Sequence, residues 1–394
     1  MKQAVLWCCA IAIAASLLAA TDYRSRDPDS SLYVRLSGEL AQQPPSRWIA
    51  PEWRGAWNQE GLFREHPVGI LLPSVFLIRA GVPAGQAAYI VNMLYQAAVI
   101  ALIPLVAGVL TRGFEARALA WVLQLLPVSF VYRIRGNQEH PLLMCFLALI
   151  YATHRARTNP AWVPLMAVSF CFLVLVKGAF AMFALVGAAL WLVVVPASSA
   201  TEQDGSSRWA WVGLAVAASA AALMTAGYEA LYVRTTGESF LEFYRSTRLG
   251  GSIQFNDPRV VPHALVNVGW YLLRLAWFAA PWSLVAFAVA WVWAVARVQG
   301  RTAQVFEAAS AQGIQWALLT TFVFIAVLSP ALVRAERFIF PTYFIIGALG
   351  VVTAIRRFDA VRRLAERADR FTWLPIAVWF LMFLLSLGSK VIRL

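Results

Sequence analysis

The sequence predicts an all-α polytopic membrane protein, and two observations support that prediction. Hydrophobic residues make up 60% of the 394 residues and charged residues only 13%, whereas a soluble domain is about 25% charged. The chain also contains roughly ten apolar runs of about 20 residues, the length that crosses a bilayer as a helix. We therefore expect residues 1–394 to form one integral membrane domain, a bundle of about 11–13 transmembrane helices.

The positions of the arginines predict how the bundle lies in the membrane. Short cytoplasmic loops of membrane proteins are rich in arginine, and the loop 356–370 holds six arginines against three acids. Residues 3–21 then form a first span that starts in the cytoplasm, an anchor rather than a cleaved signal peptide. Residues 22–86 form a first outer loop that carries interfacial helices, and residues 234–263 form a second large outer loop. We expect a bacterial inner membrane, whose outer side is the periplasm.

Net charge and cysteines argue against some classes of function. The net charge of +13 is explained by loop arginines that face anionic lipid. We therefore expect membrane lipid, and no nucleic acid, as a partner. All four cysteines lie within apolar runs, which argues against a disulfide framework and against a thiolate metal site.

Residues 26–67 form a polar stretch between the first two apolar blocks, and Asp27 and Asp29 lie at its start. A carboxylate just outside a span can take a proton from an acceptor group, and we expect Asp29 to do so. Asp is also favoured at a helix N-cap, so a cap on the helix predicted at 30–40 is the competing interpretation. His66, a lone histidine near the end of this stretch, fits a structural role as well as a catalytic one.

A second polar cluster covers residues 133–141, between two predicted spans. Arg133 and Arg135 suit a phosphate, and the neighbouring Glu139 and His140 suit a base or a metal. Two adjacent ligands are too few to predict a metal site. A loop whose long side chains snorkel to the membrane surface explains the same residues equally well.

Lys177 is the last residue of one predicted span, 160–177, and the next, 178–196, follows it directly, so the charge lies inside an otherwise apolar stretch. A charge at this depth is costly and points to a functional site, and the compact ammonium suits a phosphate. A lysine at a tight turn that snorkels to the surface is the alternative. Arg337, at the start of a late span, either faces an anion on the same side or belongs to a solvated helix start.

The order of these motifs resembles that of the GT-C glycosyltransferases, in particular the protein O-mannosyltransferases and the aminoarabinose transferases. The resemblance extends over nearly the whole chain and rests on residues 29–37, 48–51, 63–67, 139, 176–178, 281–283 and 337–341. Some positions depart from the family pattern: Ser30 stands in place of an acid, His66 in place of a lysine and Glu139 in place of an aspartate. These departures bear on the sugar and the acceptor more than on the reaction class.

The resemblance implies a dolichyl- or undecaprenyl-phosphate sugar as donor and a lipid, glycan or protein as acceptor. Asp29 is then the catalytic base and Glu139 a second acid at the site. The cations that would hold the donor phosphate are Lys177, Arg133, Arg135 and Arg337. The residues that would contact the substrates are Tyr33, Glu65, His66 and His140. The resemblance implies no particular cofactor, and a divalent metal stays open.

A multi-pass transporter or flippase for a lipid-linked or anionic solute is the main alternative, because intramembrane charges also mark transport paths. Transporters commonly show repeat-related halves with sites at mid-membrane, and we find no such repeat in this sequence. A scaffold subunit that has lost its catalytic residues is a third interpretation, which Ser30 and His66 keep open.

Overall fold

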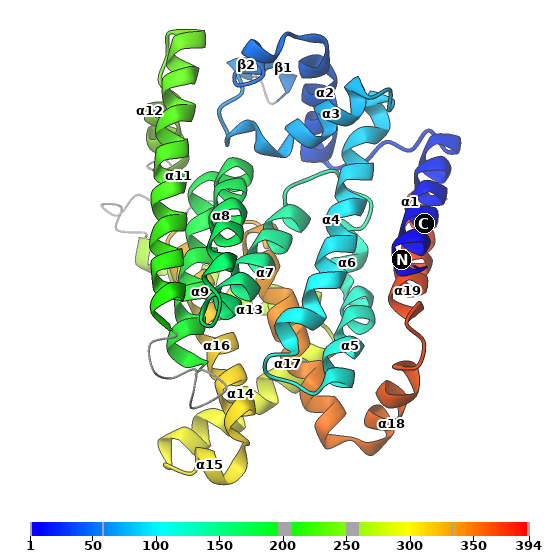
Figure 1. The fold of residues 1–394 in the computed structure, drawn as a ribbon, viewed down its shortest axis with the longest axis vertical. Coiled ribbons are helices and arrows are strands. Elements are labelled where there is room, and N and C mark those ends of the chain that lie inside the picture. Colours follow the sequence, from blue (N-terminus) through cyan, green and yellow to red (C-terminus); the bar gives the residue numbers. More distant parts are fainter. Residues whose placement is uncertain (1, 57–58, 196–206, 250–259, 332–333, 392–394) are drawn as a thin grey trace.

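The structure, a computed structural model, describes residues 2–56, 59–195, 207–249, 260–331 and 334–391. Within these ranges the chain forms a bundle of helices (Figure 1). The helices of the bundle are α1 (Lys2–Ala20), α4 (Ala84–Ala107), α5 (Gly113–Val122), α6 (Pro127–Tyr132), α7 (Glu139–Ala156), α8 (Val163–Lys177), α9 (Met182–Val194), α11 (Ser207–Thr236), α13 (Val260–Phe278), α14 (Trp282–Val298), α16 (Ala308–Leu328), α17 (Phe340–Arg357) and α19 (Leu374–Val391). Short helical turns join several of them: η3 (Leu123–Leu125), η4 (Pro160–Trp162), η5 (Gly178–Ala181) and η7 (Glu336–Ile339).

The predicted all-α polytopic membrane fold is confirmed. Six helices of the described residues are long and apolar enough to cross a membrane. They are Lys2–Ala20, Ala84–Ala107, Pro160–Val194, Ser207–Thr236, Ala308–Leu328 and Glu336–Arg357. Shorter apolar helices, α14 and α19 among them, belong to the same bundle. The count of about 11–13 crossings therefore stays a prediction.

The longest of these six segments is two antiparallel helices rather than one span. α8 ends at Lys177, and the chain turns through η5 into α9. Near the end of α8, Leu175 lies against Gly69. Late in α9, the ring of Trp191 packs 6.2 Å from that of His154, near the other end of the bundle. The reversal occurs where the sequence predicted one span to end and the next to begin.

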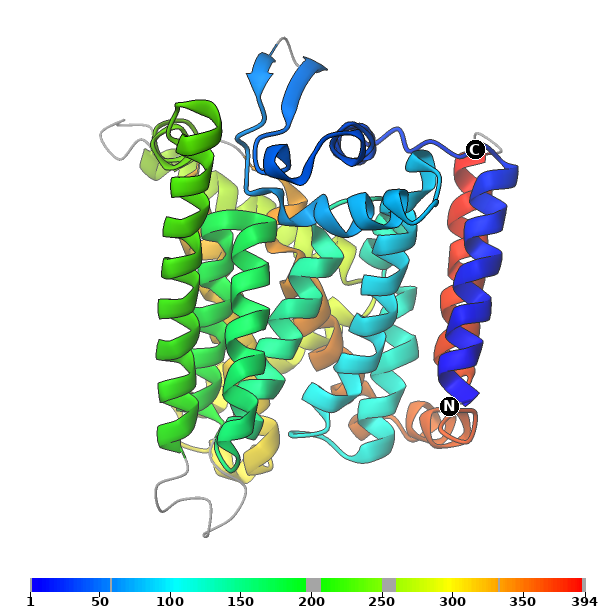
Figure 2. The same cartoon turned by 45° about the horizontal axis from the view of Figure 1, so that its top comes forward.

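One end of the bundle, which we call the loop end, is covered by the chain between α1 and α4. This cover consists of α2 (Pro28–Gln42), η1 (Pro45–Arg47), the antiparallel strands β1 (Glu52–Ala56) and β2 (Gln59–Leu62), η2 (Val68–Ile70) and α3 (Leu72–Arg79). In Figure 2, α2 and α3 lie across the bundle, and the two strands project away from it. The lateral helices match the interfacial helices expected here, whereas the strands were not expected. The side of the membrane on which this cover lies stays a prediction.

A cluster of buried side chains anchors this cover to the bundle. Tyr33 and Leu36 of α2 pack in one cluster with Phe63 and with Tyr232 of α11. Beyond α11, the second predicted outer loop, 234–263, includes α12 (Phe240–Phe243) and η6 (Tyr244–Leu249). Its residues 250–259 lie outside the described residues.

The opposite end of the bundle, which we call the arginine end, carries α15 (Thr302–Val305) and α18 (Asp359–Ala368). Here Arg356 donates two hydrogen bonds to Glu115, at 2.9 and 2.7 Å. Asp369 accepts hydrogen bonds from Arg117, which lower the pKa of that carboxyl group. The first pair joins α17 to α5, and the second joins the turn between α18 and α19 to α5.

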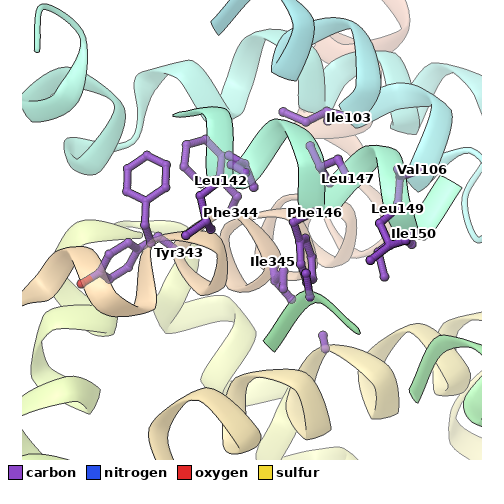
Figure 3. Packing of buried hydrophobic residues seen from close by; sticks show 14 of the residues in the cluster. Ile103, Val106, Leu142, Phe146, Leu147, Leu149, Ile150, Tyr343, Phe344 and Ile345 are labelled. Atoms are coloured by element: carbon purple, nitrogen blue, oxygen red, sulfur yellow. The ribbon is translucent and has the colours of Figure 1, made fainter. Parts of the chain in front are cut away.

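The main hydrophobic core lies between α4, α7, α9, α16 and α17, and Figure 3 shows part of it. Phe146 of α7 is 1% exposed and stacks on Trp316 of α16. α14 and α17 approach so closely at Gly350 that a Cβ there would lie 2.0 Å from the Trp282 carbonyl oxygen. Small residues at helix contacts are typical of membrane bundles, where backbones must approach each other closely.

Candidate active site

α2 begins where it does because Asp27 caps it. The Asp27 carboxylate accepts hydrogen bonds from the Ser30 backbone N–H at 3.0 Å and from the Ser30 hydroxyl at 2.8 Å, an N-cap geometry. Arg135 donates to the same carboxylate at 3.0 Å. The Ser30 hydroxyl in turn accepts from the Gly136 backbone N–H at 3.1 Å. The capping role considered for these two acids therefore belongs to Asp27, which also fastens α2 to the segment before α7.

Asp29 lies in the first turn of α2 and forms an ion pair with Arg337 of η7. The side chains of Asp29 and Arg337 are 23% and 34% exposed, so a ligand can reach both. Arg337 also lies close enough to Asp27 for their charges to interact. The acid predicted to be the base is thus in contact with one of the cations predicted to hold a phosphate.

Polar side chains of α4 hold the segment between α6 and α7 in place. Gln96 donates to the Arg133 carbonyl oxygen at 2.7 Å, and Asn92 donates to the Arg135 carbonyl oxygen. Tyr23 donates to the Ile134 carbonyl oxygen at 3.2 Å, and burial raises the pKa of Tyr23 to about 12. Tyr23 therefore stays protonated and remains a donor at neutral pH.

The two arginines of this segment point to different places. Arg133 is 3% exposed and donates to Gln96 Oε1 at 3.3 Å and to the Gln124 carbonyl oxygen at 3.1 Å. Arg135 instead lies over the ring of Tyr132, 4.4 Å from its centre, on the side of the Asp27 carboxylate. The structure therefore brings Arg135, but not the guanidinium of Arg133, to the acids of α2.

Lys177 connects the end of α8 to the start of α7. Its ammonium donates to Gln138 Oε1, and its charge interacts with those of Glu139 and Glu65. The charge of Glu139 also interacts with those of Asp27 and Arg135. The predicted acids and cations therefore form one group at the loop end, which we call the acid–cation cluster: Asp27, Asp29, Glu65, Arg135, Glu139, Lys177 and Arg337.

Gly178 places Lys177 by ending α8 directly after it. The backbone of Gly178 has a φ of 59°, in the left-handed region that favours glycine. A Cβ at this position would lie 2.6 Å from the Tyr244 hydroxyl oxygen. That hydroxyl accepts a hydrogen bond from the Ala179 backbone N–H at 3.2 Å. The ammonium of Lys177 is therefore held at a sharp helix end that is braced by η6.

Tyr33 and His66 lie behind the cluster and contact each other. His66 Nδ1 lies 2.9 Å from the Pro67 carbonyl oxygen, so this nitrogen must carry the proton. His66 Nε2 then accepts from the Tyr33 hydroxyl, also at 2.9 Å. Tyr33 is 4% exposed and His66 6%, and they support the chain on which Glu65 lies. Their contact with a substrate stays a prediction.

The start of α7 carries buried polar atoms that have no hydrogen-bond partner among the described residues. These atoms are Asn137 Oδ1, Gln138 Nε2, Glu139 Oε2 and His140 Nδ1. Buried polar groups in proteins are normally paired, and each exception calls for an explanation. The His140 ring packs 5.4 Å from that of Phe340, which fixes its place. These four residues follow one another in the sequence beside the acid–cation cluster, so their unpaired atoms are available to a polar ligand there.

Neither a protein-family model nor a curated protein sequence matches this chain, but solved structures do. ArnT from Cupriavidus metallidurans bound to undecaprenyl phosphate matches with a TM-score of 0.67 and 15% identity, over 99% of this chain and 78% of ArnT. The apo structure of ArnT from the same organism matches with a TM-score of 0.60 and 16% identity, over 91% of this chain and 72% of ArnT. A third match is the archaeal oligosaccharyltransferase AglB from Archaeoglobus fulgidus, in complex with an inhibitory peptide and a dolichol-phosphate. Its TM-score is 0.53 and its identity 13%, over 98% of this chain and 55% of AglB.

The chain has a GT-C-like fold. The fold expected from the order of motifs is therefore confirmed, and it extends over nearly the whole chain. The sequence resemblance placed Asp29, Glu139, Lys177 and Arg337 at one site of such a fold, and the structure brings these four residues to the loop end. Their roles stay predictions.

Sequence reasoning missed several polar residues that organise this GT-C-like fold around its cluster. Gln138 and Asn137 were not singled out, although both belong to the polar segment 133–141. Asn92 and Gln96 were also missed, although amides four residues apart on an apolar helix share one face and polar groups within a span are costly. That spacing was the available signal.

The described residues hold no group of three His, Cys, Asp or Glu side chains that could bind a metal ion. A cavity of about 370 Å³ is present in the structure, but the acid–cation cluster does not line it. The cavity extends instead toward the arginine end, where its lining includes Glu307, Arg356 and Arg357. The candidate site rests on charges and unpaired polar atoms, not on that cavity.

Proposed function

We propose that this chain is a membrane glycosyltransferase that moves a sugar from a polyprenyl-phosphate donor to an acceptor. The observation that carries the proposal is the acid–cation cluster at the loop end of a GT-C-like fold, with Asp29 paired to Arg337. The structures of ArnT and AglB that match this chain contain undecaprenyl phosphate and a dolichol-phosphate, respectively. The acceptor is a lipid, a glycan or a protein.

Lys177 and Arg337 are proposed to hold the donor phosphate, with Arg135 beside them. A lipid-linked donor keeps its chain in the bilayer and its phosphate at the surface, and we expect these cations to lie at that depth. When the sugar departs, the phosphate gains negative charge. Fixed cations aimed at that charge stabilise the transition state more than the ground state, and this difference accelerates the reaction.

Asp29 is proposed to be the base. In the structure, Arg337 forms an ion pair with the Asp29 carboxylate, and a donor phosphate that binds Arg337 would free that carboxylate. The acceptor hydroxyl or amine then gives its proton to Asp29 and attacks the anomeric carbon. The bond from that carbon to the phosphate oxygen breaks through an oxocarbenium-like state, and polyprenyl phosphate leaves. One displacement of this kind inverts the anomeric configuration.

The unpaired polar atoms of residues 137–140 are proposed to contact the sugar. Amide, carboxylate and imidazole groups match the hydroxyl groups of a sugar as donors and acceptors. Left unpaired in a buried place, each such group costs about 1–3 kcal/mol, and a bound sugar would remove that cost. Glu139 is the acid among these four residues, and its charge interacts with that of Lys177.

A transfer assay with purified protein in proteoliposomes tests the proposal. Radiolabelled polyprenyl-phosphate sugars are the donors, and a crude membrane extract is the acceptor pool. We expect Asp29→Asn to lower turnover by about 10²–10⁴-fold, the usual cost of removing a positioned base, and Lys177→Ala to weaken donor binding. Asp22→Asn and Lys390→Ala are matched controls, because both residues are exposed and lie outside the cluster.

Transfer of label that both site variants abolish and both controls retain would support the proposal. Donor binding without transfer from any donor would overturn it in favour of the transporter. In that case label would cross the liposome membrane on an unchanged donor, and Asp29→Asn would leave this movement intact.

A further inference from the structure

The cavity of about 370 Å³ inside the bundle is long and runs along α17. Its wall is formed mainly by α4, α7, α16 and α17, and Figure 3 shows Ile103, Leu147 and Ile345 in this region. Along α17 the lining extends from Phe344 to Arg357, a rise of about 20 Å in an α-helix. Half of a bilayer's hydrocarbon core is about 15 Å thick. The cavity is therefore long enough to hold one whole lipid chain of a leaflet.

An aromatic layer separates this cavity from the candidate active site. Phe344, at the inner end of the cavity, packs 5.3 Å from Phe340. Phe340 in turn packs 5.1 Å from Tyr132 and 5.4 Å from His140. The lining residues that are exposed, Glu307 and Arg357 among them, lie at the arginine end. The mouth of the cavity therefore faces the arginine end, away from the acid–cation cluster.

The wall of the cavity offers few polar atoms to a ligand. The Thr111 hydroxyl donates to the Ala107 carbonyl oxygen at the end of α4, and the Thr353 hydroxyl donates to the Leu349 carbonyl oxygen within α17, both at 2.8 Å. The Trp316 indole N–H donates to the Gly187 carbonyl oxygen at 3.0 Å. Most other lining residues are Leu, Ile, Val, Ala or Phe. Such a wall matches a hydrocarbon chain and not a water-soluble molecule.

The mouth leaves one arginine available to an anion. Arg356 donates hydrogen bonds to Glu115 and to the Ser310 hydroxyl, and Glu307 lies close enough to Arg356 for their charges to interact. Arg357 lines the mouth, is exposed, and enters no ion pair found among the described residues. Its guanidinium can therefore meet a headgroup whose chain enters the cavity.

The neighbouring helix α18 has the character of a helix that lies on an anionic membrane surface. It carries arginines at positions 362, 363 and 367 against two acids, Asp359 and Glu366, and Arg362 pairs with Asp359 at 2.7 Å. Leu364 on α18 is 58% exposed and Phe358, just before it, 56%. Exposed apolar side chains between arginines favour a position at the headgroups of anionic lipid. The mouth of the cavity opens beside this surface, since α17 leads directly into α18.

We infer that this cavity binds one acyl chain of an anionic phospholipid, with the headgroup held at Arg357. The site is distinct from the acid–cation cluster and does not depend on the proposed transferase activity. The chain would fill the space between α4, α7, α16 and α17, and would therefore support the packing of the bundle from inside.

Photo-crosslinking in nanodiscs tests this inference. The full chain is placed in phosphatidylcholine nanodiscs that contain a minor fraction of phosphatidylglycerol with a diazirine on one acyl chain, and the label is mapped by mass spectrometry. We expect label on α16 and α17 at lining positions such as Ala348 and Val352. We expect Gly313→Leu to lower that label severalfold, because a Cβ at Gly313 meets only Leu110, at 3.5 Å, and the rest of the side chain would enter the cavity. Gly227→Leu on α11 is the control, because a Cβ there meets nothing within 4 Å.

The headgroup is tested with Arg357→Gln. This change should weaken labelling by the phosphatidylglycerol probe about fivefold, the equivalent of about 1 kcal/mol for one arginine at an anionic surface. It should leave labelling by a matched phosphatidylcholine probe unchanged. Arg363→Gln, which removes the same charge on α18, should have a smaller effect.

Equal labelling by both probes in the wild type, or full labelling of Gly313→Leu, would overturn the inference. Loss of label on addition of undecaprenyl phosphate, with no competition by unlabelled phosphatidylglycerol, would also overturn it, because a polyprenyl chain would then be the occupant.

Discussion

Asp27 and Asp29 are two residues apart in the sequence, yet their carboxylates serve different purposes. Asp27 is the N-cap and has an extended backbone, whereas Asp29 lies in the first turn of α2, so the two carboxylates make different hydrogen bonds and ion pairs. The Asp27 carboxylate accepts hydrogen bonds from Ser30 and Arg135, and the Asp29 carboxylate forms an ion pair with Arg337. The first acid fixes the start of α2, and the second lies where a ligand can exchange with its arginine.

The cap and the ion pair of Asp27 can be separated by substitution. Asp27→Asn keeps a capping oxygen but loses the charge, whereas Asp27→Ala loses both. Because a lost N-cap costs about 0.5–2 kcal/mol, we expect Asp27→Ala to lower the thermal midpoint in detergent more than Asp27→Asn. Asp22→Asn, in the exposed turn before α2, is the control, because Asn tolerates the positive φ of 43° at this position. Equal losses in the two Asp27 variants would mean that the pair with Arg135, and not the cap, holds α2.

At the residue scale, the sequence predicted which charged residues gather at one end of the bundle better than it predicted the direction of each side chain. Asp29, Glu139, Lys177 and Arg337 each lie next to a predicted span, which is why an arrangement at one end could be expected. The direction of Arg133 could not be predicted. It depends on Gln96 and Gln124, which belong to other helices.

Among the elements, α14 and α17 make a contact that depends on one glycine. A Cβ at Gly350 would meet the Trp282 carbonyl oxygen, which is backbone and cannot turn aside. Because overpacking typically costs about 1–3 kcal/mol, we expect Gly350→Ala to lower the thermal midpoint and to loosen α14. Gly227→Ala on α11 should be neutral or slightly stabilising, since alanine is favoured over glycine in a helix by about 0.5–1 kcal/mol. Similar midpoints for the two variants would contradict this account.

The sequence predicted helices well where apolar length decides and less well where tertiary contacts decide. The reversal after Lys177 was expected, because a charge and a glycine interrupt an apolar run there. The strands β1 and β2 were not expected, because residues 52–62 mix acids, glycine and tryptophan without a clear alternation. They pair with each other within the cover, and β1 contacts α2.

For the whole molecule, the arginines predict which end of the bundle faces the cytoplasm. The arginine end should lie inside, by the positive-inside rule, and the loop end outside. We expect a membrane-impermeant maleimide to label Arg245→Cys on η6 in intact cells, but Gln304→Cys on α15 only after the membrane is opened. Wild type, whose four cysteines lie in helices of the bundle, gives the background. The reverse pattern would place the acid–cation cluster in the cytoplasm.

α1 and α19 lie side by side and run in the same direction. Gln3 donates to the Thr372 carbonyl oxygen, and the rings of Trp7 and Trp379 pack 5.4 Å apart, so the starts of both helices lie together (Figure 2). Residues 2 and 391 are therefore found at opposite ends of the bundle, and we expect the chain between them to cross the bilayer an odd number of times. A fluorescent protein fused before α1 and an identical one fused after α19 would then fold in different compartments.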